Sequence, residues 1–312
     1  MSKPKRKKKT TIGDILWRII FFAALVVFCY CAFRLVTIFL EYKRGTDEYS
    51  ALEQRYVIKE ETDKEKESEQ ENRQESGNTT KESDTQGMGT DEEPATEPET
   101  ETEIVEDEQG RTTVKIYPVM KNPIDFKSLK EVNEDIIGWI KVNALDISYP
   151  IAQGEDNEYY LHKTFERQDN FAGCIFMEYQ NKSDFSDKNT IIYGHNMKNG
   201  SMFGTLKKFY EEGVYESAPY FWIYTPDKIY KYDIFSCSQV DASGRAYQIT
   251  FSDEEDFSRY LDEAKVRSVV DSGKVQVDTT DKIVTLSTCT GNEATRFIVQ
   301  GKLAKTYKAL NP

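Results

Sequence analysis

The stretch Thr285-Leu286-Ser287-Thr288-Cys289 has the regular alternation of a half-buried β-strand and ends on a cysteine. Consecutive side chains of a strand point to opposite faces, so Ser287 shares the face of Cys289 and Thr288 lies on the other. The pattern therefore predicts a cysteine that emerges at the end of a strand, beside a hydroxyl group.

The residues that follow predict a hairpin. Residues 290–295 contain the turn-forming pair Gly291-Asn292, and residues 296–300 alternate again. Side chains opposite each other on one face of an antiparallel pair have Cβ atoms about 4.5–5.5 Å apart. We therefore expect Arg296 to lie within reach of Cys289 across the hairpin.

The rest of residues 111–312 is rich in short strand-like runs. Other candidate strands cover residues 138–142, 147–152, 174–179, 190–193, 221–225 and 229–240. Candidate helices cover residues 125–130, 156–161 and a later segment that begins at the capping box Ser252–Glu255 and ends near Gly273. Many short strands with one late helix predict a mainly β fold, a closed or nearly closed β-barrel with helices at its edge.

The candidate base for the cysteine is one of only two histidines. A thiol needs a basic or cationic neighbour to become a good nucleophile. His195 follows the apolar strand 190–193 and a glycine, at a strand-end loop position where catalytic groups tend to lie. His162 falls on a predicted helix and is expected to be a surface or packing residue. The predicted catalytic residues are therefore Cys289, His195 and Arg296.

The remaining cysteines and the charge of residues 111–312 give no indication of a metal-binding or a nucleic-acid-binding protein. Cys174 and Cys237 lie in strand-like runs and are expected to be buried, and no Cys/His spacing indicates a metal site or a cofactor. Residues 111–312 carry 25 basic and 29 acidic side chains, which is not the charge pattern of a nucleic-acid-binding protein.

The segment that precedes this domain is strongly acidic. Residues 60–108 contain 20 acidic and 4 basic side chains, with Glu-Pro and Thr repeats and little apolar content. Such a composition cannot bury enough surface to fold. We interpret residues 41–110 as a disordered, extended tether, an inert spacer rather than a specific binding segment.

The N-terminus resembles a membrane anchor. A basic tail, residues 1–14, precedes an apolar run, residues 15–40, with no small-residue cleavage site after it. We expect a single uncleaved transmembrane helix with a cytoplasmic N-terminus, because positive charge stays on the cytoplasmic side, and an extracellular domain in residues 111–312.

Three separated motifs, in this order, resemble class B sortases, the membrane-anchored cysteine transpeptidases of Gram-positive bacteria. The matching stretches are Ile192-Tyr193-Gly194-His195, the cysteine strand 285–289, and Arg296 with residues 299–303. Residues 175–179 and 201–204 also look like family segments, and the likeness covers residues 120 to 305. The leading helices and the late helix are similar to class B rather than to the more minimal housekeeping class.

The resemblance implies a mechanism and partners. Cys289 would attack a Thr carbonyl in the C-terminal sorting signal of a surface protein, and a cell-wall amine of a peptidoglycan precursor would resolve the thioester. His195 would move protons and Arg296 would stabilise the oxyanion. Ser287 and Thr288 are candidates for lining the substrate site. The sorting signal would be of an Asn-Pro-x-Thr type or a variant of it.

Two alternatives remain open at this point. The same three residues would serve a hydrolytic cysteine peptidase, in which water resolves the thioester. A chain of this organisation is also compatible with an inactive, membrane-anchored assembly scaffold.

Overall fold

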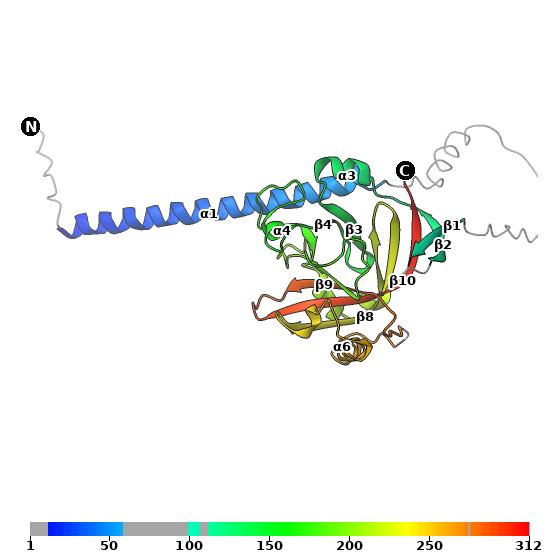
Figure 1. Ribbon diagram of the computed structural model, residues 1–312. Helices are drawn as coiled ribbons and strands as arrows, with labels where there is room; N and C mark the ends of the chain where they lie inside the picture. The colour runs from blue at the N-terminus through cyan, green and yellow to red at the C-terminus, as the bar shows by residue number, and fades with distance from the viewer. Residues whose placement is uncertain (1–11, 59–98, 107–111, 274, 312) are drawn as a thin grey trace, which may run out of the picture. The chain divides into compact units, whose positions relative to one another are not determined.

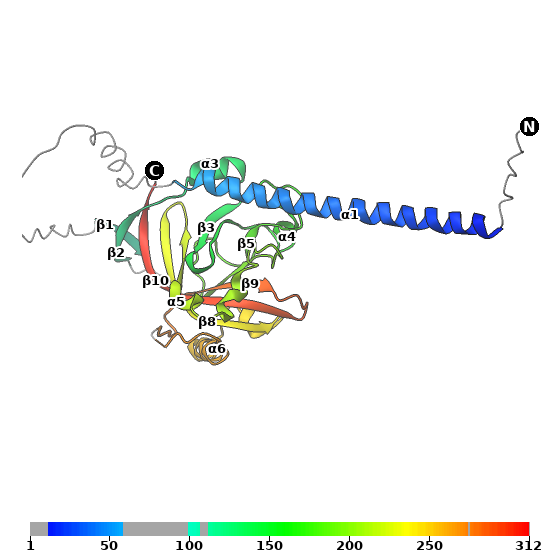
Figure 2. The same cartoon turned by 180° about the vertical axis from the view of Figure 1, so that it is seen from behind.

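The computed structural model describes residues 12–58, 99–106, 112–273 and 275–311 (Figures 1 and 2). The chain divides into two compact units, Met1–Tyr49 and Ser50–Pro312. The helices and strands are α1 (Ile12–Tyr56), β1 (Thr100–Glu106), β2 (Thr112–Lys121), α3 (Phe126–Val132), β3 (Ile136–Val142), η1 (Asn143–Leu145), β4 (Ile147–Ala152), α4 (Tyr159–His162), β5 (Ile175–Met177), β6 (Asn189–Tyr193), η2 (Leu206–Tyr210), α5 (Val214–Ser217), β7 (Tyr220–Tyr224), β8 (Lys228–Asp241), η3 (Arg245–Tyr247), α6 (Glu254–Val266), β9 (Ile283–Cys289) and β10 (Thr295–Leu310).

The first unit holds most of the long helix α1. This helix is long and apolar enough to cross a membrane, judged by length and composition. Its large apolar side chains are exposed, for example Trp17 at 70% and Phe28 at 69%. The helix contains the expected anchor, residues 15–40, and continues without a break to Tyr56.

The second unit is built around a closed barrel. Its strand order is β1-β2-β10-β8-β7-β3-β4-β5-β6-β9, and β9 also pairs with β10. The eight strands from β10 round to β9 therefore form a ring in which every strand has two neighbours. Such closure leaves no unpaired edge within the ring. The predicted closed β-barrel with leading helices and one late helix is confirmed.

Paired aromatic rings fill part of the barrel. Phe221 on β7 lies opposite Tyr232 on β8, and their rings stack with centroids 5.2 Å apart. Such a pair adds about 0.5–1.5 kcal/mol to the stability that burial gives. The neighbouring strand β10 makes room through Gly301, where a Cβ would lie 2.5 Å from a ring carbon of Phe221. The register of β10 on β8 shifts at the same place, between Gln300 and Gly301.

Helix α6 packs on the outside of the barrel, next to β8 (Figures 1 and 2). Its buried face, which includes Phe257 and Leu261, packs with Phe235 and Ile283. The helix begins one residue later than the predicted capping box, because the side chain of Asp253 accepts the hydrogen bond from the backbone of Asp256. It ends at Val266 rather than near Gly273.

The region predicted to be a disordered tether differs from the structure in two places. Helix α1 extends to Tyr56, and β1 forms a hairpin with β2 beside the barrel strand β10 (Figure 1). Pairing with β2 supplies the backbone hydrogen bonds of β1, which offers almost no apolar surface, so composition alone gave no sign of it. Residues 59–98, the rest of that segment, lie outside the described residues.

Both ends of the 59–98 segment lie on the second unit. The backbone N–H of Ile58 donates to the carbonyl of Pro123, and the N–H of Val119 donates to the carbonyl of Glu99. Val119 and Pro123 are four residues apart in and just after β2, a distance of about 13 Å at most. The residues on either side of the acidic segment, Ile58 and Glu99, are therefore held at neighbouring points of the second unit.

Candidate active site

The hairpin of β9 and β10 brings the predicted nucleophile and the predicted arginine together. In its register Cys289 lies directly opposite Arg296, so both side chains are on the same face of the sheet. Cys289 is half-buried at the last position of β9, and it is a free thiol. The other two cysteines of the second unit, Cys174 and Cys237, are fully buried as expected, and burial raises the pKa of Cys237.

The short loop between the two strands is held by its own hydrogen bonds. The Arg296 guanidinium donates through Nη1 to the carbonyls of Glu293 and Thr295, at 2.8 and 2.9 Å. The Nζ of Lys207, from η2, donates to the carbonyl of Thr290, the residue after Cys289, at 2.7 Å. These contacts fix the backbone of the loop that follows the thiol.

His195 reaches the same place from the neighbouring strand. Strand β6 runs parallel to β9 with Tyr193 opposite Ser287, and the N–H of Gly194 donates to the carbonyl of Ser287. His195 follows the end of β6 by two residues, in the loop, and Cys289 follows Ser287 by two residues at the end of β9. The predicted base and the predicted nucleophile therefore come at the same end of two neighbouring parallel strands.

The histidine ring is oriented by a hydrogen bond. Its Nε2 lies 2.8 Å from the carbonyl oxygen of Leu161. A carbonyl can only accept, so Nε2 carries the proton and Nδ1 has no hydrogen-bond partner among the described residues. The other histidine, His162, is exposed at the end of α4.

Gly194 is required between the strand and the histidine. A Cβ at this position would lie 2.4 Å from the Ile175 side chain and 2.7 Å from the Phe203 ring. Both neighbours are fully buried, so neither can move aside easily. Because it has no side chain, Gly194 packs closely against Ile175 and Phe203, and the chain can continue from β6 into the loop that carries His195.

The two hydroxyl residues before the cysteine lie on opposite faces. Ser287 is on the Cys289 face, and its Oγ is 2.7 Å from the hydroxyl of Tyr247 in η3. Thr288 is on the other face of β9, with the buried Leu286, and its Oγ1 has no hydrogen-bond partner in the part of the chain described. Of the two candidate lining residues, only Ser287 has a side chain on the face of the thiol.

Two tyrosines that the sequence did not predict border the site. The rings of Tyr193 and Tyr247 stack with centroids 6.3 Å apart. Burial raises the pKa of Tyr247, the hydrogen bond from Ser287 and the charge of Arg296 oppose this rise, and Cys289 adds to it. Tyr247 therefore lies close to all three groups. Because it is in a loop far from the cysteine in sequence, no local pattern could have identified it.

A buried carboxylate, that of Glu178, forms a hydrogen bond with one of these two tyrosines. Glu178, which is 6% exposed, accepts hydrogen bonds from the hydroxyl of Tyr193 at 2.9 Å and from the amide of Asn157 at 2.7 Å. Burial and the charge of Glu178 raise the pKa of Tyr193. The phenol is thus a neutral donor that fixes its ring beside the histidine loop.

The thiol and the guanidinium share one face of the hairpin, the imidazole follows the neighbouring strand, and groups of these three types can carry out acyl transfer. The cysteine can act as nucleophile, the histidine as general acid and base, and the arginine as a donor to a developing oxyanion.

Comparison with known proteins identifies a family that this chain resembles in sequence. A family model described as a sortase domain matches residues 140–304. Sortase B of Listeria monocytogenes is 38% identical over 182 residues, which cover 57% of this chain and 74% of the relative. Sortase B of Staphylococcus aureus is 34% identical over 183 residues, which cover 58% of this chain and 75% of the relative.

Solved structures give the same result. A sortase B–substrate complex from Staphylococcus aureus matches with a TM-score of 0.55 and 34% identity, over 58% of this chain and 84% of that one. Sortase B of Clostridium perfringens matches with a TM-score of 0.55 and 34% identity, over 58% of this chain and all of that one.

Proposed function

Because this chain belongs to the sortase family, as a class B sortase and so a cysteine transpeptidase that acts on the sorting signals of surface proteins, we propose that Cys289, His195 and Arg296 carry out the transfer. The observation that carries this proposal is the cross-strand pair of Cys289 and Arg296, with His195 in the loop that follows β6, the strand paired in parallel with β9.

In the first half-reaction a thioester forms. The Cys289 sulfur attacks the carbonyl carbon of the Thr residue of the sorting signal, and the resulting tetrahedral intermediate expels the amine of the next residue. Nδ1 of His195 takes the proton that the Cys289 thiol loses as it attacks, and then gives this proton to the leaving amine. Nδ1 is the nitrogen available for this transfer, because Nε2 already donates to the carbonyl of Leu161.

In the second half-reaction an amine of a cell-wall precursor attacks the thioester. Nδ1 of His195 takes the proton that the amine loses and gives it to the Cys289 sulfur, which leaves as a thiol when the new amide forms. The surface protein is then joined to the wall precursor, and the enzyme returns to its starting state.

Arg296 would stabilise the negative charge on the carbonyl oxygen in both halves. Its Nη1 is occupied by the carbonyls of Glu293 and Thr295, which leaves Nη2 and Nε to donate to the oxyanion. A guanidinium presents its N–H donors in a rigid plane, which suits donation to an oxyanion.

The experiment uses the full chain in an uncharged detergent, with a panel of sorting-signal peptides that carry Thr at the scissile position. We expect peptide cleavage and, when an amine acceptor is added, a product that contains the acceptor. Cys289→Ala is expected to abolish both the thioester, detected by mass spectrometry, and the product. Turnover by Cys289→Ala would contradict the assignment.

The rival reaction is hydrolysis of the same thioester. Amine-containing product separates the two, because a hydrolase releases only the free acid under every acceptor tried. An inactive scaffold predicts a third result, no cleavage by the wild type and unchanged attachment of surface proteins in cells that carry Cys289→Ala.

We also propose a topology for the chain. Residues 1–14 form a cytoplasmic basic tail, residues 15–40 form the single membrane span, and the catalytic domain lies outside the cell. The apolar helix α1 and the positive charge before it support this orientation. Labelling single introduced cysteines from outside intact cells tests it: Lys208→Cys is expected to react, and Ser2→Cys is not.

A further inference from the structure

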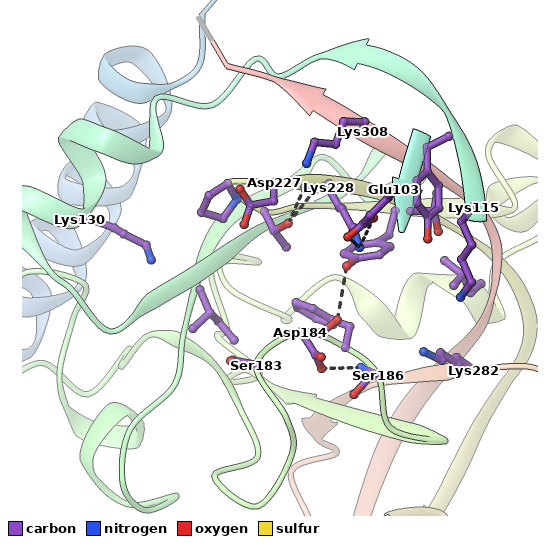
Figure 3. Close-up of a pocket in the computed structure, with 18 residues that line it drawn as sticks. Glu103, Lys115, Lys130, Ser183, Asp184, Ser186, Asp227, Lys228, Lys282 and Lys308 are labelled. Carbon is purple, nitrogen blue, oxygen red and sulfur yellow. Dashed lines mark hydrogen bonds and ion pairs between the residues drawn. The ribbon is translucent and has the colours of Figure 1, made fainter. Parts of the chain in front are cut away.

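A second cavity lies at the other end of β9 from the thiol (Figure 3). Its volume is about 740 Å³, within the range of small-ligand sites. Lys282, one of its lining residues, precedes Cys289 by seven residues along the strand, a distance of about 23 Å. A molecule in this cavity is therefore too far away to be the reacting part of the substrate.

The cavity is lined mainly by charged groups. Ammonium groups come from β2, the start of β8, the residue before β9, the end of β10, and α3. These are Lys115, Lys228, Lys282, Lys308 and Lys130, respectively.

This positive charge is only partly paired among the described residues. Lys228 forms an ion pair with Glu103 on β1, with 2.9 Å between Nζ and Oε2. Lys115, Lys282 and Lys308 have no hydrogen-bond or ion-pair partner among the described residues. Lys282 and Lys308 are half-buried. Half-buried ammonium groups without partners are costly, and a bound anion would remove that cost.

Asp184 and Asp227 also line the cavity, so five lysines face three carboxylates, Glu103 included, and an excess of two positive charges remains. Asp184 uses its Oδ1 to accept the N–H of Ser186 at 2.9 Å, within its own turn. Burial lowers the pKa of Lys282, Asp184 opposes this fall, and Lys115 and Lys228 add to it. The like charges are therefore close enough to repel one another, and Figure 3 shows Lys115 and Lys282 on the same side of the cavity.

We propose that this cavity is a binding site for a phosphoryl group, separate from the catalytic site. Lysine ammonium groups act as compact point charges for phosphate, and three unpaired ones match a multiply charged group better than a single carboxylate. Hydroxyl groups of Ser183, Ser186 and Thr306 line the same space and can donate to its oxygens.

The test measures binding of two soluble probes to the full chain in an uncharged detergent by calorimetry. Inorganic pyrophosphate represents a free phosphate compound, and glycerophosphoglycerol represents the phosphodiester of a lipid headgroup. The site variant is Lys115→Gln/Lys282→Gln. The matched control is Lys208→Gln/Lys265→Gln, which removes the same charge from two exposed lysines outside the cavity.

We expect saturable binding to the wild type and the control, at least tenfold weaker binding to the site variant, and a dissociation constant that rises with salt. Equal melting temperatures and equal cleavage of the sorting peptide by both variants show that the fold and the active site are intact. Preference for pyrophosphate identifies a free phosphate compound, and preference for the diester identifies a headgroup.

Two results would overturn the proposal. One is equal weakening in the site variant and the control, which indicates a general charge effect. The other is the absence of saturable binding of either probe, which includes the case where the acidic segment of the chain itself fills the cavity. Because peptide cleavage is measured separately, failure of this site leaves the proposed transpeptidase function standing.

Discussion

At the scale of single residues, Arg296 combines two tasks. Its Nη1 holds the carbonyls of the hairpin loop, and the rest of its fork faces the side of the sheet that carries Cys289. A lysine keeps the charge but cannot reproduce the planar fork of donors.

Arg296→Lys is therefore expected to lower kcat/KM for the sorting peptide by about 100-fold or more, the cost of losing one oxyanion donor. The melting temperature should change little, because Arg296 is at the half-exposed rim of the hairpin. Steady-state kinetics beside thermal unfolding checks this. Near-wild-type kcat/KM in the lysine variant would show that charge alone suffices.

Thr288 tests which face of β9 meets the substrate. Its Oγ1 is buried without a partner among the described residues, on the face opposite the thiol. Thr288→Val keeps the shape and removes a hydroxyl whose burial costs about 1–3 kcal/mol, so the free energy of unfolding should rise by about 1 kcal/mol or more.

Activity is expected to stay within about twofold of wild type, well under the tenfold change that corresponds to 1.4 kcal/mol. Urea unfolding and peptide kinetics measure the two effects. A clear rise in KM would instead support the sequence-based interpretation of Thr288 as a substrate-lining residue. Ser287→Ala is the matched comparison, because Ser287 hydrogen-bonds Tyr247 on the thiol face.

The sequence predicted the cysteine, histidine and arginine because each lies at the end of a strand with a strong alternating pattern. It could not predict Tyr247 or Lys207. Both come from short 3₁₀ helices with no periodicity, and both meet Cys289 or its loop only through the closed barrel. Contacts between segments far apart in sequence are set by topology, which a local pattern does not contain.

At the scale of elements, the barrel strands were predictable and the β1–β2 hairpin was not. Each barrel strand buries one or both faces, which gives it a hydrophobic signature. Strand β1 is an edge strand rich in Glu and Thr, and its Ile104 is 72% exposed. It is held by pairing with β2 and by the Glu103–Lys228 ion pair, so composition favoured disorder.

The start of α6 provides a test at this scale. The sequence offers two adjacent capping residues, Ser252 and Asp253, and in the structure only Asp253 accepts from the N3 position, at 2.8 Å from the backbone nitrogen of Asp256. Its carboxylate also favours the positive end of the helix.

Asp253→Ala is therefore expected to lower the free energy of unfolding by about 1 kcal/mol, and Ser252→Ala by much less. The midpoint of urea unfolding of the two variants, measured side by side, gives the difference. A larger loss in Ser252→Ala would mean that the capping box predicted from sequence is the one that forms in solution.

At the scale of the whole molecule, the contacts at the two ends of the acidic segment bear on its role. Composition suggested a spacer that lets the catalytic domain reach away from the membrane. The chain is already fixed to the domain at Ile58, before the segment begins, and again at Glu99, after it ends. We therefore expect the length of the segment to have little effect on the reach of the catalytic domain.

Replacing residues 59–98 with a six-residue Gly/Ser linker tests this directly. Six residues span up to about 20 Å, enough to join points about 13 Å apart, so the domain should fold with a melting temperature no lower than that of the full chain. Shortening a closed loop from 40 residues to six lowers the entropic cost of closing that loop. This would stabilise the fold by about 1–2 kcal/mol if the loop makes no contacts.

The decisive measurement is attachment of a reporter surface protein in cells, compared between the full chain and the shortened one. If the segment is a loop on the domain, attachment and in vitro kcat/KM are both retained. A spacer predicts a different combination, with kcat/KM retained and attachment lost, because the active site would no longer reach its substrates. The two hypotheses predict the same kcat/KM and differ only in attachment in cells. Measuring both therefore separates an effect on the reach of the domain from an effect on catalysis.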